Sequence, residues 1–157
     1  MPQVSDIRLM VRAEQPVLSA RMKASYKEIE WLFATKRQDA LSLLRPTGVY
    51  MTDVPFVIYH DYLNLDVENL DMEICFPLSA WMEGNESLQP RIIPQTKVVH
   101  CLFKGDEDEM DYLYGEMTSW IMQKGYEPEG SAYEFYYIRK EHPYDERLTK
   151  IVLPVKD

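Results

Sequence analysis

One carboxylate within an aromatic segment is the side chain best placed to do chemistry. It is Glu134, in the segment "SAYEFYYIRK" that spans residues 131–140. The density of Tyr and Phe, with turn-forming residues on both sides, predicts a β-strand. Because side chains alternate between the two faces of a strand, Glu134 shares one face with Tyr136. The other face carries three aromatic rings, those of Tyr133, Phe135 and Tyr137.

The surroundings of Glu134 indicate what this acid could bind. A carboxylate among apolar groups loses hydration, which disfavours its charged form. A bound cation or neighbouring phenol donors would restore the charged form, and each aromatic face attracts a cation by roughly 0.5–2 kcal/mol. The pattern therefore favours broad recognition of lipophilic cations. The alternative is that Glu134 points to solvent from a half-exposed sheet, because Glu is rarely buried.

The elements that must position Glu134 follow from the hydrophobic pattern. In the first half, a capping box at Ser25 and Glu28 predicts the start of a helix, which "RPTG" (residues 45–48) ends. The buried stripe of this helix is expected at Ile29, Leu32, Phe33, Ala40, Leu43 and Leu44. Strands are expected at Val17–Met22, Pro55–Tyr62 and Leu70–Leu78, with an extra leading strand near Asp6–Val11.

The second half repeats this order. Asp106, followed by Glu109 three residues later, predicts the start of a second helix, and Gly125 ends it. The buried stripe of this helix is expected at Met110, Leu113, Met117, Trp120 and Ile121. Strands are expected at Lys97–Phe103, Ala132–Arg139 and Leu148–Val155.

The two halves agree in register as well as in order. A shift of 81 residues carries Ser25 onto Asp106 and Glu28 onto Glu109, and a shift of 77 carries "EICFPL" (residues 73–78) onto "KIVLPV" (residues 150–155). We therefore expect an α+β fold made of a duplicated β-α-β-β repeat with pseudo-two-fold symmetry. Its antiparallel sheet would carry two helices on one face. The prediction is a single domain over residues 1–157, with repeat one at about 1–80 and repeat two at about 95–157.

Composition and charge exclude several classes of function. The chain has a net charge of −9, and an acidic surface repels phosphate backbones, so direct nucleic-acid binding is not expected. No apolar run reaches the length of a membrane span, and the N-terminal segment has charges where a signal peptide needs an apolar core. Two isolated cysteines, Cys75 and Cys101, suit a reducing compartment. A cytoplasmic protein without membrane contact is therefore predicted.

Most other kinds of catalytic chemistry lack a motif. His60, His100 and His142 are not spaced as metal ligands, and His100 and Cys101 are adjacent in a strand, so they face opposite sides. No glycine-rich phosphate loop and no serine elbow motif is present. We expect neither a metal nor a cofactor.

Several motifs occur in a characteristic order over nearly the whole chain. The stretch "GVYMTDVPFVIYHDY" (residues 48–62) precedes Gly105, Trp120, "GYEPEG" (residues 125–130), Glu134-Phe135-Tyr136 and "IVLPV" (residues 151–155). In this order they resemble the GyrI-like small-molecule-binding family, which also forms the effector-binding domains of multidrug-responsive and AraC-type transcription regulators. One position departs from the family pattern, because Glu107 stands where relatives often have Tyr.

The resemblance implies a ligand groove along the pseudo-two-fold axis. Glu134 would lie at the floor of this groove with Tyr136 beside it, and flat, often cationic apolar compounds would bind there. Glu107 in place of Tyr implies a difference in pocket lining or ligand class. No helix-turn-helix segment precedes the domain, so a stand-alone form rather than a one-chain regulator is expected.

Four further aromatic residues are candidates for the same groove. Tyr59 occupies a place in the first half analogous to Tyr136 in the second, although ordinary core packing explains it equally well. Trp120 lies on the buried stripe of the second helix, where it can be core or touch a ligand. Tyr50 and Trp81 lie in connecting segments, where a large aromatic residue acts as a lid or covers the core.

The leading prediction is a small-molecule-binding protein that captures lipophilic compounds, cations among them, in an aromatic groove with a carboxylate. The first alternative is a hydrolase of small electrophilic compounds, in which Glu134 orients water and Tyr136 or Tyr59 donates a proton. The second alternative is a gyrase-inhibitor-like protein-interaction module, whose acidic surface meets a basic partner or imitates DNA charge.

Overall fold

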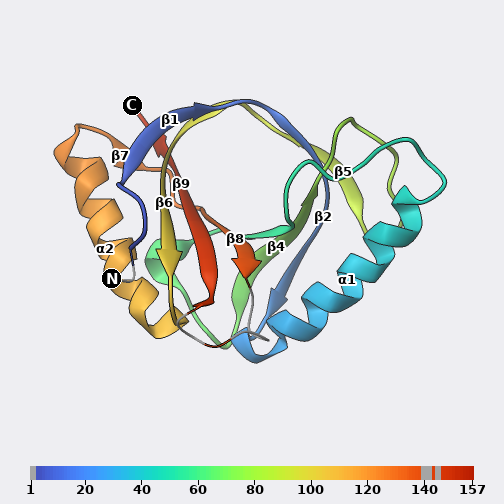
Figure 1. Ribbon diagram of the computed structural model, residues 1–157, viewed down its shortest axis with the longest axis horizontal. Coiled ribbons are helices and arrows are strands. Elements are labelled where there is room, and N and C mark those ends of the chain that lie inside the picture. Colours follow the sequence, from blue (N-terminus) through green and yellow to red (C-terminus); the bar gives the residue numbers. More distant parts are fainter. Residues whose placement is uncertain (1–2, 139–142, 144–145) are drawn as a thin grey trace. The chain divides into compact units, whose positions relative to one another are not determined.

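The chain forms two compact units, which the computed structural model describes for residues 3–138, 143 and 146–157 (Figure 1). The central unit is Ala13–Gln95, and the terminal unit joins Met1–Arg12 to Thr96–Asp157. Each unit contains one α-helix and a set of antiparallel strands. The predicted α+β class, with antiparallel strands and two helices, is therefore confirmed.

The central unit is built around one long strand. β4 (Leu70–Pro77) pairs with β3 (Phe56–Tyr59) on one side and with β2 (Gln15–Ala24) on the other. β5 (Gln89–Ile93) pairs with β2, and it was not expected because it is short and contains Pro90. β3 is shorter than the predicted Pro55–Tyr62, because the chain turns at His60 and Asp61, before the 3-10 turn Tyr62–Asn64.

The helix of the central unit begins where the sequence predicts. The Ser25 side chain accepts a hydrogen bond from the backbone of Lys27, and the Glu28 carboxylate accepts one from the backbone N–H of Ser25 at 3.0 Å. These two bonds form the predicted capping box. The first turn has 3-10 geometry, and α1 then runs over Ile29–Leu44.

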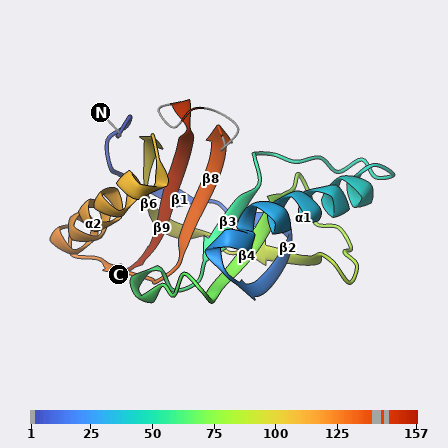
Figure 2. The same ribbon diagram turned by 90° about the horizontal axis from the view of Figure 1, so that it is seen from below.

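The terminal unit contains the strand that carries Glu134. β9 (Leu148–Lys156) pairs with β6 (Thr96–Lys104), with β8 (Ala132–Ile138) and with the short β7 (Glu127–Pro128). α2 (Glu107–Gln123) follows β6. Figure 2 shows α2 beside these strands. Gly125, with a φ of 87°, ends the helix in the left-handed conformation that favours glycine.

The leading strand belongs to a different unit from the one predicted. β1 (Arg8–Arg12) pairs with β6 of the terminal unit, whereas the sequence pattern placed it with the first half. The prediction is wrong on this point because strand pairing depends on which edge is available in three dimensions. The β6 edge opposite β9 accepts β1, as the β2 edge opposite β4 accepts β5.

Strand registers in the two units correspond. The shift of 77 residues carries the pair Tyr59–Met72 of β3 and β4 onto the pair Tyr136–Thr149 of β8 and β9. The shift of 81 carries Ala20 of β2 onto Cys101 of β6. Ala20 pairs with Ile74 and Cys101 pairs with Ile151, and these two partners are related by the shift of 77. This agreement supports the predicted repeat, because a register is independent of the sequence similarity that suggested it.

Each helix packs against strands of its own unit. In the central unit, the rings of Phe33 on α1 and Phe76 on β4 lie 6.4 Å apart. In α2, four of the five residues of the predicted stripe are buried: Met110, Leu113, Met117 and Ile121. The fifth, Trp120, is only half-buried, so its assignment to the core is wrong. In the described part of the chain, neither helix is both long and apolar enough to cross a bilayer.

Candidate functional site

Glu134 is buried in the terminal unit, with 8% of its surface exposed. Its strand β8 pairs with β9 through Glu134 and Ile151, so both side chains lie on one face of these strands. The same face meets α2, because Tyr114 of that helix contacts the Glu134 carboxylate. The alternative in which Glu134 points to solvent is therefore wrong.

Two phenols hold this carboxylate from opposite elements. The Tyr114 hydroxyl on α2 donates a hydrogen bond to Oε2 at 2.5 Å, and the Tyr136 hydroxyl on β8 donates one to Oε1 at 2.7 Å. Hydrogen bonds to a charged acceptor are stronger than those between neutral groups, so they offset part of the hydration that the buried carboxylate loses. Each carboxylate oxygen can accept more than one hydrogen bond, so phenol contact alone does not saturate the group.

The opposite face of β8 has a different character. The Arg12 guanidinium carbon lies 4.8 Å from the ring centre of Tyr133, and the Lys150 ammonium lies 4.6 Å from that of Phe135. Phe135 and Tyr137 stack with 13° between their ring planes. Cations of the chain itself therefore contact the aromatic rings on this face, whereas the carboxylate lies on the other.

The remaining predicted site residues lie in distinct surroundings. Tyr59 is 7% exposed and faces the α1 side of the central unit, because it pairs with Met72, two positions from Ile74 and four from Phe76. Tyr50 and Trp81 are 66% and 49% exposed, so neither covers the core. Trp120 is on α2, and the Lys124 ammonium lies 5.4 Å from its ring centre. The structure thus brings Glu134 and Tyr136 together within one unit.

Tyr114 is a functional candidate that the sequence analysis did not single out. It lies four residues after Met110 and three before Met117, both buried, so helical spacing places it beside the inward face of α2. That spacing could have identified it. Glu107 begins α2, but its side chain lies outside the part of the chain that the structure describes.

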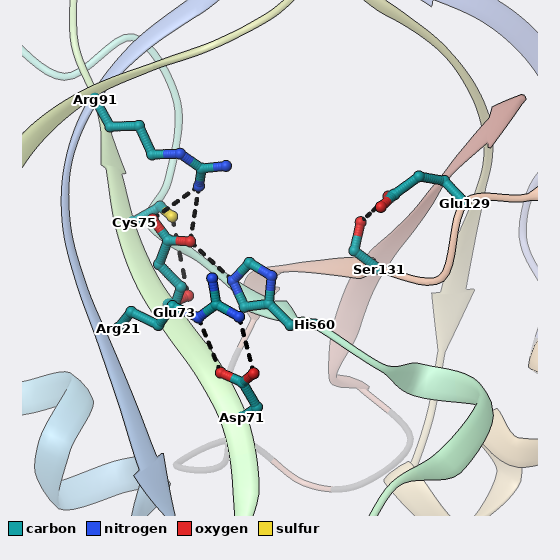
Figure 3. Close-up of polar contacts among 8 residues, drawn as sticks. All are labelled: Arg21, His60, Asp71, Glu73, Cys75, Arg91, Glu129 and Ser131. Atoms are coloured by element: carbon teal, nitrogen blue, oxygen red, sulfur yellow. Dashed lines mark hydrogen bonds and ion pairs between the residues drawn. The ribbon is translucent and has the colours of Figure 1, made fainter.

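A second buried carboxylate, Glu73 on β4, has basic partners (Figure 3). Nη1 of Arg91 lies 2.7 and 2.9 Å from its two oxygens, and Nε2 of His60 lies 2.9 Å from Oε1. Burial raises the pKa of Glu73, but hydrogen bonds from His60 and Ser19 and the charge of Arg91 outweigh it and hold the pKa at about 2. Glu73 is therefore ionised at neutral pH and can only accept, so Nε2 of His60 carries the hydrogen.

The Glu73 cluster lies on the face of the central unit opposite α1. Cross-strand partners share a face, and Glu73 alternates with Ile74 and Phe76, which point toward the helix. Arg21 and Asp71 form an ion pair at 2.9 Å on the same face as Glu73. This cluster was not predicted because its members come from three strands and from the turn after β3, although an acid in "LDMEICFPL" is the same signal as Glu134 in its own strand.

The described residues contain no group of three or more His, Cys, Asp or Glu side chains that could hold a metal ion. Cys75 and Cys101 are both buried free thiols. Burial raises the pKa of Cys101, so this thiol is a poor nucleophile. His142 lies outside the described residues.

Solved proteins of similar fold include EcmrR, a hydrolase from Listeria innocua and SAV2435. EcmrR is 22% identical over 96% of this chain, with a TM-score of 0.83 for its crystallised C-terminal domain, of which 97% is covered. In the cryo-EM structure of EcmrR with DNA, the TM-score is 0.84 and the chain spans 57% of the EcmrR chain. No curated protein sequence matches this chain.

The other two proteins are more distant. A hydrolase from Listeria innocua has a TM-score of 0.70 and 12% identity, covering 96% of this chain and 91% of its own. SAV2435, solved bound to tetraphenylphosphonium, has a TM-score of 0.62 and 12% identity, covering 97% and 94%. At 12% identity, these two comparisons establish a similar fold and nothing about function.

The sequence itself matches one family model from near its start to near its end. The model is the GyrI-like small-molecule-binding domain, and it matches residues 5–156. This range includes the whole central unit and every helix and strand described above. The chain belongs to the GyrI-like small-molecule-binding family.

Proposed function

We propose that this protein binds lipophilic organic cations through the carboxylate of Glu134. The observation that carries the proposal is a buried acid whose two oxygens accept hydrogen bonds from the phenols of Tyr114 and Tyr136. The phenols orient the carboxylate and replace part of its hydration. A diffuse organic cation gives up little hydration of its own, so it can pair with such a group at low desolvation cost.

The ligand class has a second support. SAV2435, a protein of similar fold, was solved with tetraphenylphosphonium, a cation with four aromatic rings. Aromatic side chains around a carboxylate suit such a ligand, because ring faces attract cations and bury apolar area.

The direct test is calorimetric titration with tetraphenylphosphonium. Glu134→Gln keeps the shape of the side chain but removes its charge, and we expect affinity to fall about tenfold or more. Glu127→Gln, at an exposed position of β7 in the same unit, is the matched control and should leave affinity unchanged. Neutral triphenylphosphine oxide should bind both Glu134 forms equally. Equal affinity of wild type and Glu134→Gln for the cation would refute the proposal.

A second candidate function is hydrolysis of a small electrophilic compound. It is favoured by the contact between the Tyr136 hydroxyl and Glu134, and by the Listeria innocua hydrolase of similar fold. Glu134 would position water while Tyr136 or Tyr114 donates a proton to the leaving oxygen. Turnover of an epoxide such as styrene oxide, lost in both Glu134→Gln and Tyr136→Phe, would select this function. Cation binding without turnover would exclude it for that substrate class.

A further inference from the structure

The outer face of α2 contains a hollow that is separate from the Glu134 carboxylate. It has a volume of about 610 Å³ and lies wholly in the terminal unit. Ile7, just before β1, forms one wall, and the helix supplies the rest at positions one turn apart. We call it the α2 hollow, and its residues used below are Ile7, Asp111, Tyr112, Gly115, Glu116 and Trp120.

Gly115 gives the hollow its depth. Glycine is unfavourable within a helix, because it loses more backbone freedom than any other residue. Neither backbone nor packing requires it here, since Gly115 does not have a positive φ and a Cβ at this position would meet nothing within 4 Å. The absence of a side chain therefore serves to leave open space between Tyr112 and Trp120.

The charged residues that line the hollow are both acidic. α2 contains five acidic residues and no Lys or Arg, and two of those acids, Asp111 and Glu116, line the hollow. Just beyond the helix, the ammonium of Lys124 lies 5.4 Å from the ring centre of Trp120, so this ring already contacts a cation. A partner for this surface should therefore combine apolar groups with positive charge.

The hollow is too open for a small molecule to be the favoured occupant. Tyr112 is 76% exposed, whereas small-molecule pockets usually bury most of the ligand surface. A second copy of the chain is also disfavoured, because each carries a net charge of −9. An exposed Tyr and a half-buried Trp beside a cavity are typical of the residues that dominate protein–protein binding.

We propose that the α2 hollow docks a basic, apolar segment of a partner protein. An aliphatic side chain of the segment enters the space above Gly115, between Tyr112 and Trp120. Its Lys or Arg residues meet Asp111 and Glu116. This surface is independent of the Glu134 carboxylate, which Tyr114 contacts from another side of the same helix.

The test uses a fluorescent 14-residue helical peptide of Leu and Lys, (LKKLLKL)₂, with binding measured by anisotropy. Gly115→Leu fills the hollow without removing any contact, and it replaces glycine with a better helix former, so folding should not be impaired. We expect Gly115→Leu and Tyr112→Ala each to weaken peptide binding about tenfold. Trp31→Ala removes an aromatic residue that is 68% exposed on α1, and it should leave the dissociation constant within about twofold.

Three outcomes would overturn the proposal. The first is equal weakening by Trp31→Ala and the α2 variants, which indicates general attraction to an acidic protein. The second is displacement of the peptide by benzyltrimethylammonium at equal affinity in wild type and Gly115→Leu. The third is a concentration-dependent dimer in sedimentation that Gly115→Leu abolishes. Unchanged peptide binding by Glu134→Gln is expected and separates this test from that of the proposed function.

Discussion

Replacing Glu73 by Gln should change how the stability of the protein depends on pH. Glu73 has an ordinary pKa of 4.5 and a folded-state pKa of about 2. Because the folded-state pKa is lowered, the ionised group stabilises the fold fully above about pH 5. This contribution is lost as the pH falls toward 2, since both states then bind the proton. The difference between the two pKa values corresponds to about 3 kcal/mol of unfolding free energy.

The structure gives the physical origin of this magnitude. Glu73 has 3% of its surface exposed, so water screens its contacts with Arg91 and His60 only weakly. Replacing the carboxylate by a neutral amide removes this contribution of about 3 kcal/mol at neutral pH, while the Arg91 side chain, which is 40% exposed, stays partly hydrated. Glu73→Gln should therefore be less stable than wild type at pH 7 but less sensitive to acid. The two stability curves should approach each other near pH 2.

The assay is urea unfolding followed by circular dichroism at a series of pH values and constant ionic strength. The matched control is Asp71→Asn, which breaks the ion pair with Arg21 on the same face of the sheet. Both of those side chains are substantially exposed, so this change should cost less than about 1 kcal/mol. If the difference in unfolding free energy between wild type and Glu73→Gln stays constant from pH 7 to pH 2.5, the reasoning is refuted.

Three further predictions concern α2 and the start of α1, each checked by urea unfolding. Tyr114→Phe removes a hydrogen bond to the buried Glu134 and should lower the unfolding free energy by about 1.5–3 kcal/mol. The control Tyr112→Phe, on the exposed face of α2, should change the unfolding free energy by less than about 0.5 kcal/mol. Equal effects of the two variants would contradict the contact between Tyr114 and Glu134. Gly115→Ala should raise the unfolding free energy by about 0.5–1 kcal/mol, and a decrease would mean that packing requires the glycine. Ser25→Ala removes the cap before α1 and should lower it by about 0.5–2 kcal/mol, and no change would show that the capping box contributes nothing.

The two buried acids of this protein illustrate two ways of stabilising a carboxylate. Glu73 is ionised through contact with basic side chains of its own unit. Glu134 accepts hydrogen bonds from two phenols, which orient it. If the proposed function is right, a cationic ligand binds at Glu134. A cationic ligand at Glu73 would instead compete with Arg91, so we propose a structural role for that cluster.

Local signals in the sequence were sufficient for several features of the fold. The capping box at Ser25 and Glu28, the buried positions of α2 and the face of β8 that carries Glu134 all follow from spacing within a few residues. The shifts of 81 and 77 residues, from which the sequence predicts a repeat, also relate the strand registers of the two units. Helical and strand periodicities report which side chains share a face, and they do so without knowledge of the partner.

Tertiary structure alone decided the features that join distant segments. β1 pairs with β6, about ninety residues away in the sequence. β5, at the end of the central unit's sequence, pairs with β2 at its start. The partners of Glu73 come from two strands and a turn that are far apart in the sequence, and Tyr114 reaches Glu134 from a helix twenty residues earlier. Periodicity tells that a side chain points inward but not what it meets there, because the meeting point is set by the packing of all the elements together.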